Sequence, residues 1–255
     1  MNITVKEAGK TYPDGTVALK DISFTIKPGE GVVILGSNGC GKSTLLKMML
    51  GLESATKGSI LFDDKDITKS RGRTLRRIRL KVGSVFQHFN LVGNVSVFQN
   101  VLFGIMGHKG LLGSLNLTAS SETRDQACHC LNRVGLVHLM NRRTDTLSGG
   151  QQQRLAIARM LMQNPAVVFA DEPVASLDPK AGRQVMELLW DVVEERKMTV
   201  VCVLHQLDLA LEYAERIIGI KQGLVAFDSS PSKLEKQILE TLYEGEEPED
   251  SEEYS

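Results

Sequence analysis

The sequence predicts an α/β protein with a parallel sheet, an antiparallel β subdomain near the N-terminus and an inserted helical subdomain. Three short runs, at 32–35, 167–170 and 200–204, are apolar on both faces, as expected of buried parallel strands. Between the last two, apolar residues at 185–192 follow the i, i+3, i+4, i+7 spacing of an amphipathic helix. This alternation of strands and helices is typical of a parallel sheet covered by helices.

The N-terminal elements have a different pattern. Ile3 and Val5 alternate with polar residues, and so do the apolar positions of 22–26. This alternation indicates antiparallel strands with one buried face. The stretch 11–16 between them contains Pro-Asp-Gly, which favours a turn.

The middle of the chain lacks the pattern of a buried strand. We therefore interpret residues from about 89 to 164 as an inserted helical subdomain. Within it, the stretch 104–122 is rich in Gly and Ser and is predicted to be an exposed loop. Near the C-terminus, 217–227 is expected to form a hairpin that turns at Lys221-Gln-Gly223.

Composition and charge exclude several classes. The 255 residues are 42% hydrophobic, and the net charge of −1 excludes a basic footprint for nucleic acid over the whole chain. Seven acidic residues and no basic residue lie in 244–255, which we expect to be a disordered tail. No apolar run approaches the ~18 residues of a membrane span, and no signal peptide is expected. The four cysteines are expected to be free thiols in a reducing cytosol.

A phosphate-binding loop follows the first buried strand. Residues 36–44 match G-x-x-x-x-G-K-[ST], between the strand 32–35 and a helical segment. Glycines let successive N–H groups point at phosphate oxygens, Lys42 can reach the β- and γ-phosphates, and the Ser43 hydroxyl can bind Mg²⁺. The predicted nucleotide contacts of this loop are Gly36, Ser37, Asn38, Gly39, Cys40, Gly41, Lys42, Ser43 and Thr44.

Two carboxylates end the strand 167–170. Asp171 is placed where parallel strands present Mg²⁺ ligands beside a phosphate loop, so we predict that it serves the metal. Glu172 is predicted to polarise the attacking water. Pro173 follows directly, which distinguishes this pair from an ordinary exposed acidic pair.

A second anion site is predicted at Leu147-Ser148-Gly149-Gly150-Gln151, immediately before a helical segment. A serine and two glycines at a helix start offer N–H groups and a hydroxyl to an anion. Because 36–44 already holds one nucleotide, this second site is redundant unless it serves the nucleotide of another molecule.

With these motifs in place, residues 1–230 resemble the ATP-binding-cassette (ABC) ATPases, whose signature is LSGGQ. The resemblance implies a RecA-like P-loop NTPase core, ATP and Mg²⁺ as cofactors, and a head-to-tail dimer. In that dimer each ATP lies between 36–44 of one copy and 148–151 of the other. The resemblance further assigns adenine stacking to Tyr12, contact with Mg²⁺ and water to Gln87, the dimer interface to Asp178 and the γ-phosphate switch to His205. It leaves residues 231–255 as a C-terminal helix and tail.

A finer resemblance is to the phosphonate-importer ATPases. It rests on FNLV at 89–92, on 145–159, 171–179 and 204–210, and on the His205-Gln206 pair. It implies phosphonate import, with phosphite, hypophosphite or phosphate as alternatives. The implied partners are permease subunits and, indirectly, a periplasmic or lipid-anchored binding protein, with the chain peripheral at the cytoplasmic face of the inner membrane.

Two other classes compete with a transporter. A non-transport ABC ATPase acting on DNA or ribosomes usually has a coiled-coil insertion, zinc motifs or two cassettes, and the sequence shows none of these. A metabolic P-loop kinase needs an acceptor site rather than a second clamp for the γ-phosphate, so the motif at 148–151 argues against it.

Overall fold

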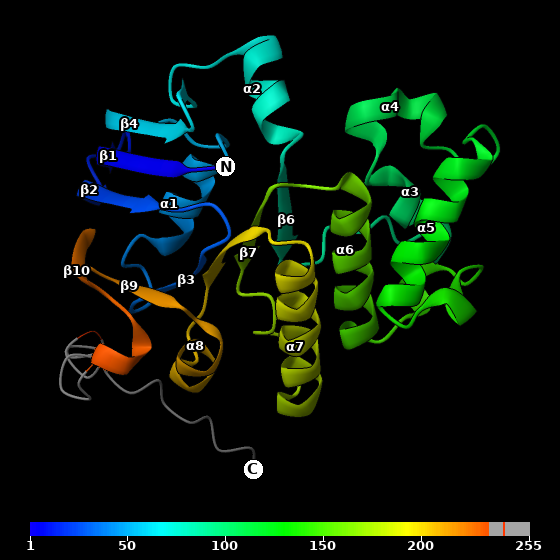
Figure 1. Ribbon diagram of the computed structural model, residues 1–255. Coiled ribbons are helices and arrows are strands. Elements are labelled where there is room, and N and C mark those ends of the chain that lie inside the picture. Colours follow the sequence, from blue (N-terminus) through cyan, green and yellow to red (C-terminus); the bar gives the residue numbers. More distant parts are fainter. Residues whose placement is uncertain (235–241, 243–255) are drawn as a thin grey trace.

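The computed structural model describes residues 1–234 and Leu242. It contains two sheets, and Figure 1 shows the smaller sheet on the opposite side of the molecule from the helices α3, α4 and α5. The smaller sheet is antiparallel, in the order β2-β1-β4-β5, as the alternating pattern predicts. Its strands are β1 (Ile3–Thr11), β2 (Val17–Ile26), β4 (Lys57–Phe62) and β5 (Lys65–Asp66).

The larger sheet has the order β10-β9-β3-β8-β7-β6, and all its neighbours are parallel except the edge pair β9–β10. The predicted parallel strands and the C-terminal hairpin are therefore confirmed. The strands are β3 (Gly31–Leu35), β6 (Val82–Phe86), β7 (Val167–Asp171), β8 (Thr199–Val203), β9 (Arg216–Lys221) and β10 (Leu224–Ser229).

Strand β3 is shared by two hydrophobic cores. Val33 and Leu35 face the core built with the helical segments, whereas Val32 and Ile34 face the core shared with α1 and the antiparallel sheet. All four side chains are fully buried. Burial on both faces explains why this strand is apolar throughout rather than alternating.

The inserted segment is helical, as predicted, with one correction. The stretch 104–122 is not simply an exposed loop, because it contains α4, the start of α5 and the fully buried Ser114. Gly110, at φ 72°, breaks α4, so glycine marks a kink rather than the absence of a helix. The helices are α1 (Lys42–Met49), α2 (Gly72–Arg79), α3 (Val97–Phe103), α4 (Met106–Gly113), α5 (Ser121–Arg133), α6 (Gly149–Gln163), α7 (Pro179–Glu195) and α8 (Leu207–Tyr213), with short 3-10 turns at Val137–Leu139, Thr144–Thr146 and Pro231–Lys233.

The predicted C-terminal helix and acidic tail fall almost entirely outside the described residues. Within the described part of the chain, no helix is long and apolar enough to cross a membrane.

Candidate functional site

The predicted site residues gather at the carboxyl ends of the parallel strands of the larger sheet. The register pairs Ile34 with Val203, Val203 with Asp171, and Asp171 with Phe86, so four parallel strands end level with one another. Because β8 lies between β3 and β7, His205, two residues after the end of β8, lies between the phosphate loop and the two carboxylates. The residues at these strand ends are the loop 36–44, His205, Asp171, Glu172 and Gln87.

The phosphate loop depends on glycine at two positions. At Gly36 a Cβ would lie 2.2 Å from the carbonyl oxygen of Ile220, and at Gly41, where φ is 111°, it would lie 2.6 Å from that of Ala18. Any side chain at either position would displace neighbouring backbone. Gly41 is also the N-cap of α1 and has no side chain to cap the helix, so the first turn, which contains Ser43 and Thr44, presents its N–H groups toward an anion.

Lys42 lies folded over its own loop. Its Nζ donates to the carbonyl oxygens of Gly36 (2.7 Å) and Ser37 (2.9 Å), and the side chain is buried. These acceptors hold the ammonium beside the position of the phosphates. Cys40 is 5% exposed and packs in the core around α1, and its backbone N–H donates to the carbonyl oxygen of Ser37 (3.3 Å). A phosphate contact through this N–H would require that hydrogen bond to be exchanged. Asn38 and Gly39 form the exposed tip of the loop.

Asp171 has the environment of a metal ligand. Its Oδ1 is buried and, among the described residues, no donor is within hydrogen-bond range. Burial raises the pKa of this carboxyl and the neighbouring Glu172 raises it further, while Lys47, Lys42 and His205 oppose them. A buried acceptor without a donor is unfavourable, and a bound cation would relieve it. The half-buried Ser43 and Gln87 would supply further oxygen ligands, so the residues present fit Mg²⁺.

The raised pKa of Asp171 predicts how stability depends on pH. Because the folded state holds this proton more tightly than the unfolded state, ionisation of Asp171 costs stability, and the cost is complete only above the folded pKa. Asp171→Asn should therefore raise the Tm of the nucleotide-free protein at neutral pH, with a gain that shrinks as pH falls through that pKa. Thermal melts from pH 4 to 8 without magnesium test this, and a gain independent of pH would contradict it.

Glu172 and His205 are in direct contact. His205 Nε2 lies 2.5 Å from Glu172 Oε1, and both side chains are half-buried. Glu172 has φ 47°, and its N–H donates to the carbonyl oxygen of Val203. This left-handed conformation is rare for a residue with a side chain and is often found at functional sites. The imidazole thus holds the carboxylate in a fixed orientation, as a general base requires.

Tyr12 lies beside the phosphate loop. Its hydroxyl is 3.3 Å from Thr44 Oγ1, and Lys10 Nζ lies 4.9 Å from the centroid of its ring. The lysine covers one face of the ring, so adenine would stack on the other.

Tyr12→Ala is expected to raise the KM for ATP about tenfold and to reduce the preference for ATP over GTP, because a stacked aromatic contact is lost. Tyr12→Phe keeps the ring and loses only the hydroxyl contact with Thr44, so it should retain the preference. Initial rates with both nucleotides measure this, and an unchanged ATP/GTP ratio in Tyr12→Ala would contradict stacking.

The residues of the predicted second anion site line a separate cavity of about 380 Å³. Ser148 is the N-cap of α6 and forms a capping box with Gln151, and Asp178 caps α7 by accepting from Ala181 N. A Cβ at Gly149 would lie 3.1 Å from Leu177 Cδ2, so the loop before α7 packs against the start of α6. The lining contains Ser148, Gly149, Gly150, Gln151, Ser176, Leu177 and Asp178 and no residue of 36–44. The two predicted anion sites are thus not joined within one chain.

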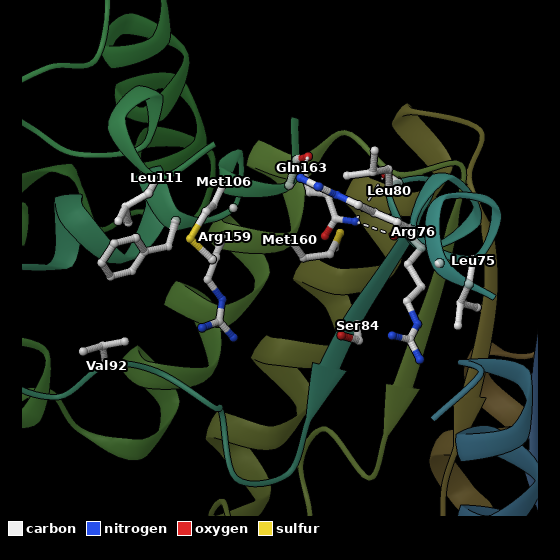
Figure 2. Close-up of a pocket in the computed structure, with 15 residues that line it drawn as sticks. Leu75, Arg76, Leu80, Ser84, Val92, Met106, Leu111, Arg159, Met160 and Gln163 are labelled. Carbon is white, nitrogen blue, oxygen red and sulfur yellow. Dashed lines mark hydrogen bonds between the residues drawn. The ribbon is translucent and has the colours of Figure 1, made fainter. Parts of the chain in front are cut away.

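A larger groove of about 910 Å³ lies between α2, β6, α4 and α6 (Figure 2). Phe98 does not line this groove, because it is 3% exposed and part of the core. Phe86, Phe89 and Leu91 do not line the groove either, whereas Val92 does. The sequence reasoning also missed Arg159, which lines it. The available signal was a single arginine within the apolar run of α6.

Comparison with known proteins decides the family. Residues 19–175 match the family model described as ABC transporter. The chain belongs to the ABC transporter family. As an ABC ATPase it binds and hydrolyses ATP.

Curated relatives of this ABC ATPase match it over almost its whole length. A "Phosphonates import ATP-binding protein PhnC" from Shouchella clausii is 47% identical over 94% of this chain and 91% of its own. "Phosphonates import ATP-binding protein PhnC 3" from Halalkalibacterium halodurans is 45% identical over 94% of this chain and 93% of its own.

Solved structures of ABC ATPases share the fold. The dimeric post-hydrolysis state of the ATP-binding cassette MJ0796, bound to ADP and Pi, is 37% identical with a TM-score of 0.79. It covers 90% of this chain and 98% of its own. The cbiO1 protein of Clostridium perfringens, part of the ABC transporter complex cbiONQ, is 35% identical with a TM-score of 0.80 and covers 94% of each chain.

Proposed function

We propose that this ABC ATPase is the ATP-hydrolysing subunit of an importer for phosphonates. The observation that carries the proposal is the match with phosphonate import proteins at 45–47% identity over 94% of the chain. FNLV at 89–92 and His205-Gln206 support the same assignment. Phosphite, hypophosphite and phosphate importers would share this architecture, because the ATPase does not contact the transported solute.

In the proposed site, Lys42 exchanges its two carbonyl partners for phosphate oxygens. Asp171, Ser43 and Gln87 would hold Mg²⁺, which would supply neutralisation of the charge on the β- and γ-phosphates. Glu172 accepts the proton of the attacking water while His205 fixes its orientation. Tyr12 supports the adenine.

The second copy completes this site. The cavity around Ser148 and Asp178 contains no residue of the phosphate loop, so it would contact the nucleotide of a partner chain. The related cassette bound to ADP and Pi is dimeric, which supports a head-to-tail dimer. The γ-phosphate would then bind both copies, and hydrolysis would remove that link and open the dimer.

The membrane partner is proposed to be a pair of permease subunits supplied by a solute-binding protein outside the membrane. Because no helix in the described part of the chain could span a bilayer, the permease would supply the membrane path. The ATPase would bind it from the cytoplasmic face as a peripheral subunit.

Growth complementation tests the proposal. A bacterial host that lacks phosphonate uptake but can metabolise phosphonates is given this chain with its cognate permease and binding protein, and grows on 2-aminoethylphosphonate as sole phosphorus source. We expect growth with the wild-type chain and none with Glu172→Gln. Growth on phosphite but not on the phosphonate would reassign the solute, and growth on neither, with the ATPase active, would contradict the proposed substrate class.

A further inference from the structure

Helix α6 holds strand β6 at the beginning of the strand. Gln163 Nε2 donates to three backbone carbonyl oxygens around that end, among them that of Val82 at 2.8 Å. One residue further along, a Cβ at Gly83 would lie 2.7 Å from Met160 Cγ. Strand and helix therefore pack without space between them, and Figure 2 shows Met160 and Gln163 on the groove side of α6.

Arg159 binds the loop that follows the end of β6. One turn of α6 before Gln163, its guanidinium donates to the carbonyl oxygens of Asn90 (2.6 Å) and Phe89 (3.0 Å). Both acceptor residues have positive φ. Phe89, two residues after Gln87, has φ 56°, and Asn90, three residues after it, has φ 49°. Two consecutive left-handed residues with side chains are unfavourable unless their surroundings hold them. The planar guanidinium can donate to two adjacent carbonyl oxygens at once, as it does here.

Among the residues that the structure describes, the charge of Arg159 has no acidic counterpart in the groove. The described lining contains Arg76, Arg79 and Arg159 and no aspartate or glutamate. Arg159 is partly buried, and burial lowers the pKa of its guanidinium. A partly desolvated cation bonded to backbone carbonyls is costly compared with an apolar side chain that would fill the same space. Its placement is better explained by the loop that it holds.

We propose that Arg159 is a positioning residue that fixes the loop after Gln87 and so sets the position of the Gln87 side chain beside Asp171. The proposal rests on the proposed function, which gives Gln87 its contact with magnesium. Helix α6 begins at the Ser148–Gln151 cavity, which would contact the partner's nucleotide. The same helix would therefore connect that cavity to the predicted magnesium site of its own chain.

The test uses the intact purified protein and its intrinsic ATPase. Arg159→Met keeps the length of the side chain and removes its donors, so kcat should fall by between about tenfold and a hundredfold, as a misplaced site residue does. The Mg²⁺ concentration for half-maximal activity should rise, while nucleotide affinity measured without magnesium should stay unchanged. Arg159→Lys, which keeps one donor group, should fall between wild type and Arg159→Met. A purely structural role would not move the Mg²⁺ dependence separately from nucleotide affinity.

A matched control and a rescue experiment sharpen the result. Arg196 also donates to a backbone carbonyl, that of Leu161, two residues after Arg159. Its acceptor is on the helix rather than in the loop after Gln87, so Arg196→Met should keep the wild-type Mg²⁺ dependence. Because the groove is open to solvent, millimolar guanidinium should partly restore kcat in Arg159→Ala and leave Arg196→Ala unchanged. Hydrogen exchange at the amides of Phe89 and Asn90 should accelerate in Arg159→Met.

Three results would overturn the proposal: an unchanged Mg²⁺ dependence in folded Arg159→Met, failure of guanidinium to restore Arg159→Ala, or the same effects in the Arg196 variants. If Arg159→Met does not fold, the rescue of Arg159→Ala decides. Failure of the role given to Gln87 is distinguishable, because Gln87→Ala would then keep the wild-type Mg²⁺ dependence while Arg159→Met still accelerated exchange at Phe89 and Asn90.

Discussion

Glu172→Gln is expected to reduce ATP turnover by about two to four orders of magnitude while leaving ATP binding intact. Removing a general base costs about 10²–10⁴ in rate, and glutamine is isosteric but accepts no proton. The amide can keep the contact with His205 Nε2 that the carboxylate makes at 2.5 Å, so the local structure should persist. Phosphate release measures the loss, and size-exclusion chromatography with ATP should show an accumulated dimer.

Glu195→Gln is the matched control for this prediction. Glu195 is exposed at the end of α7, where it pairs with Arg133 at 2.9 Å. The same chemical change there should leave turnover within about twofold of wild type, because exposed ion pairs contribute little to stability. If Glu172→Gln retained more than about a tenth of wild-type turnover, Glu172 would not be the base.

Ser148→Asp should produce the second large loss of ATP turnover. This variant separates the role of Ser148 in capping α6 from its predicted contact with nucleotide. Ser148 caps α6 through its hydroxyl, and aspartate caps a helix about as well as serine. The fold should therefore keep its Tm, whereas the added carboxylate would face the γ-phosphate of the partner's ATP. We expect ATP-dependent dimerisation to disappear and turnover to fall about a hundredfold, with nucleotide affinity of the monomer unchanged.

Two variants make this result specific. Ser120 caps α5 in the same way, by accepting from Thr123 N, and lies outside the Ser148 cavity, so Ser120→Asp should keep full activity. Ser148→Asn supplies a neutral cap and should lose less activity than Ser148→Asp. Equal losses in the two Ser148 variants would show that charge is not the cause. A collapse of monomer affinity for ATP would contradict a contact made from the partner chain.

Much of the fold could be predicted because the pattern of each strand reflects its burial. Strand β3 is apolar on both faces because each face packs into a core, and β1 alternates because only one face is covered. The phosphate loop could be located because Gly36 and Gly41 have no room for a side chain. These are local requirements, and a single sequence displays them.

Other features depended on contacts between distant segments. Hydropathy alone does not distinguish an aromatic residue that faces a partner from one, such as Phe98, that helix packing places in the core. The glycines of 104–122 suggested a loop, whereas the segment is helical on either side of a kink at Gly110. The role of Arg159 depends on two carbonyl oxygens about seventy residues earlier in the chain. No local sequence pattern predicts such a long-range contact.

The burial of β3 between two cores has a mechanical consequence. A displacement of either the antiparallel sheet or the helical layer must act on the same five-residue strand, which leads directly into the nucleotide loop. Tightly packed side chains transmit strain rather than absorb it. A relative motion of the two layers would therefore strain this strand and reach the nucleotide loop that it carries.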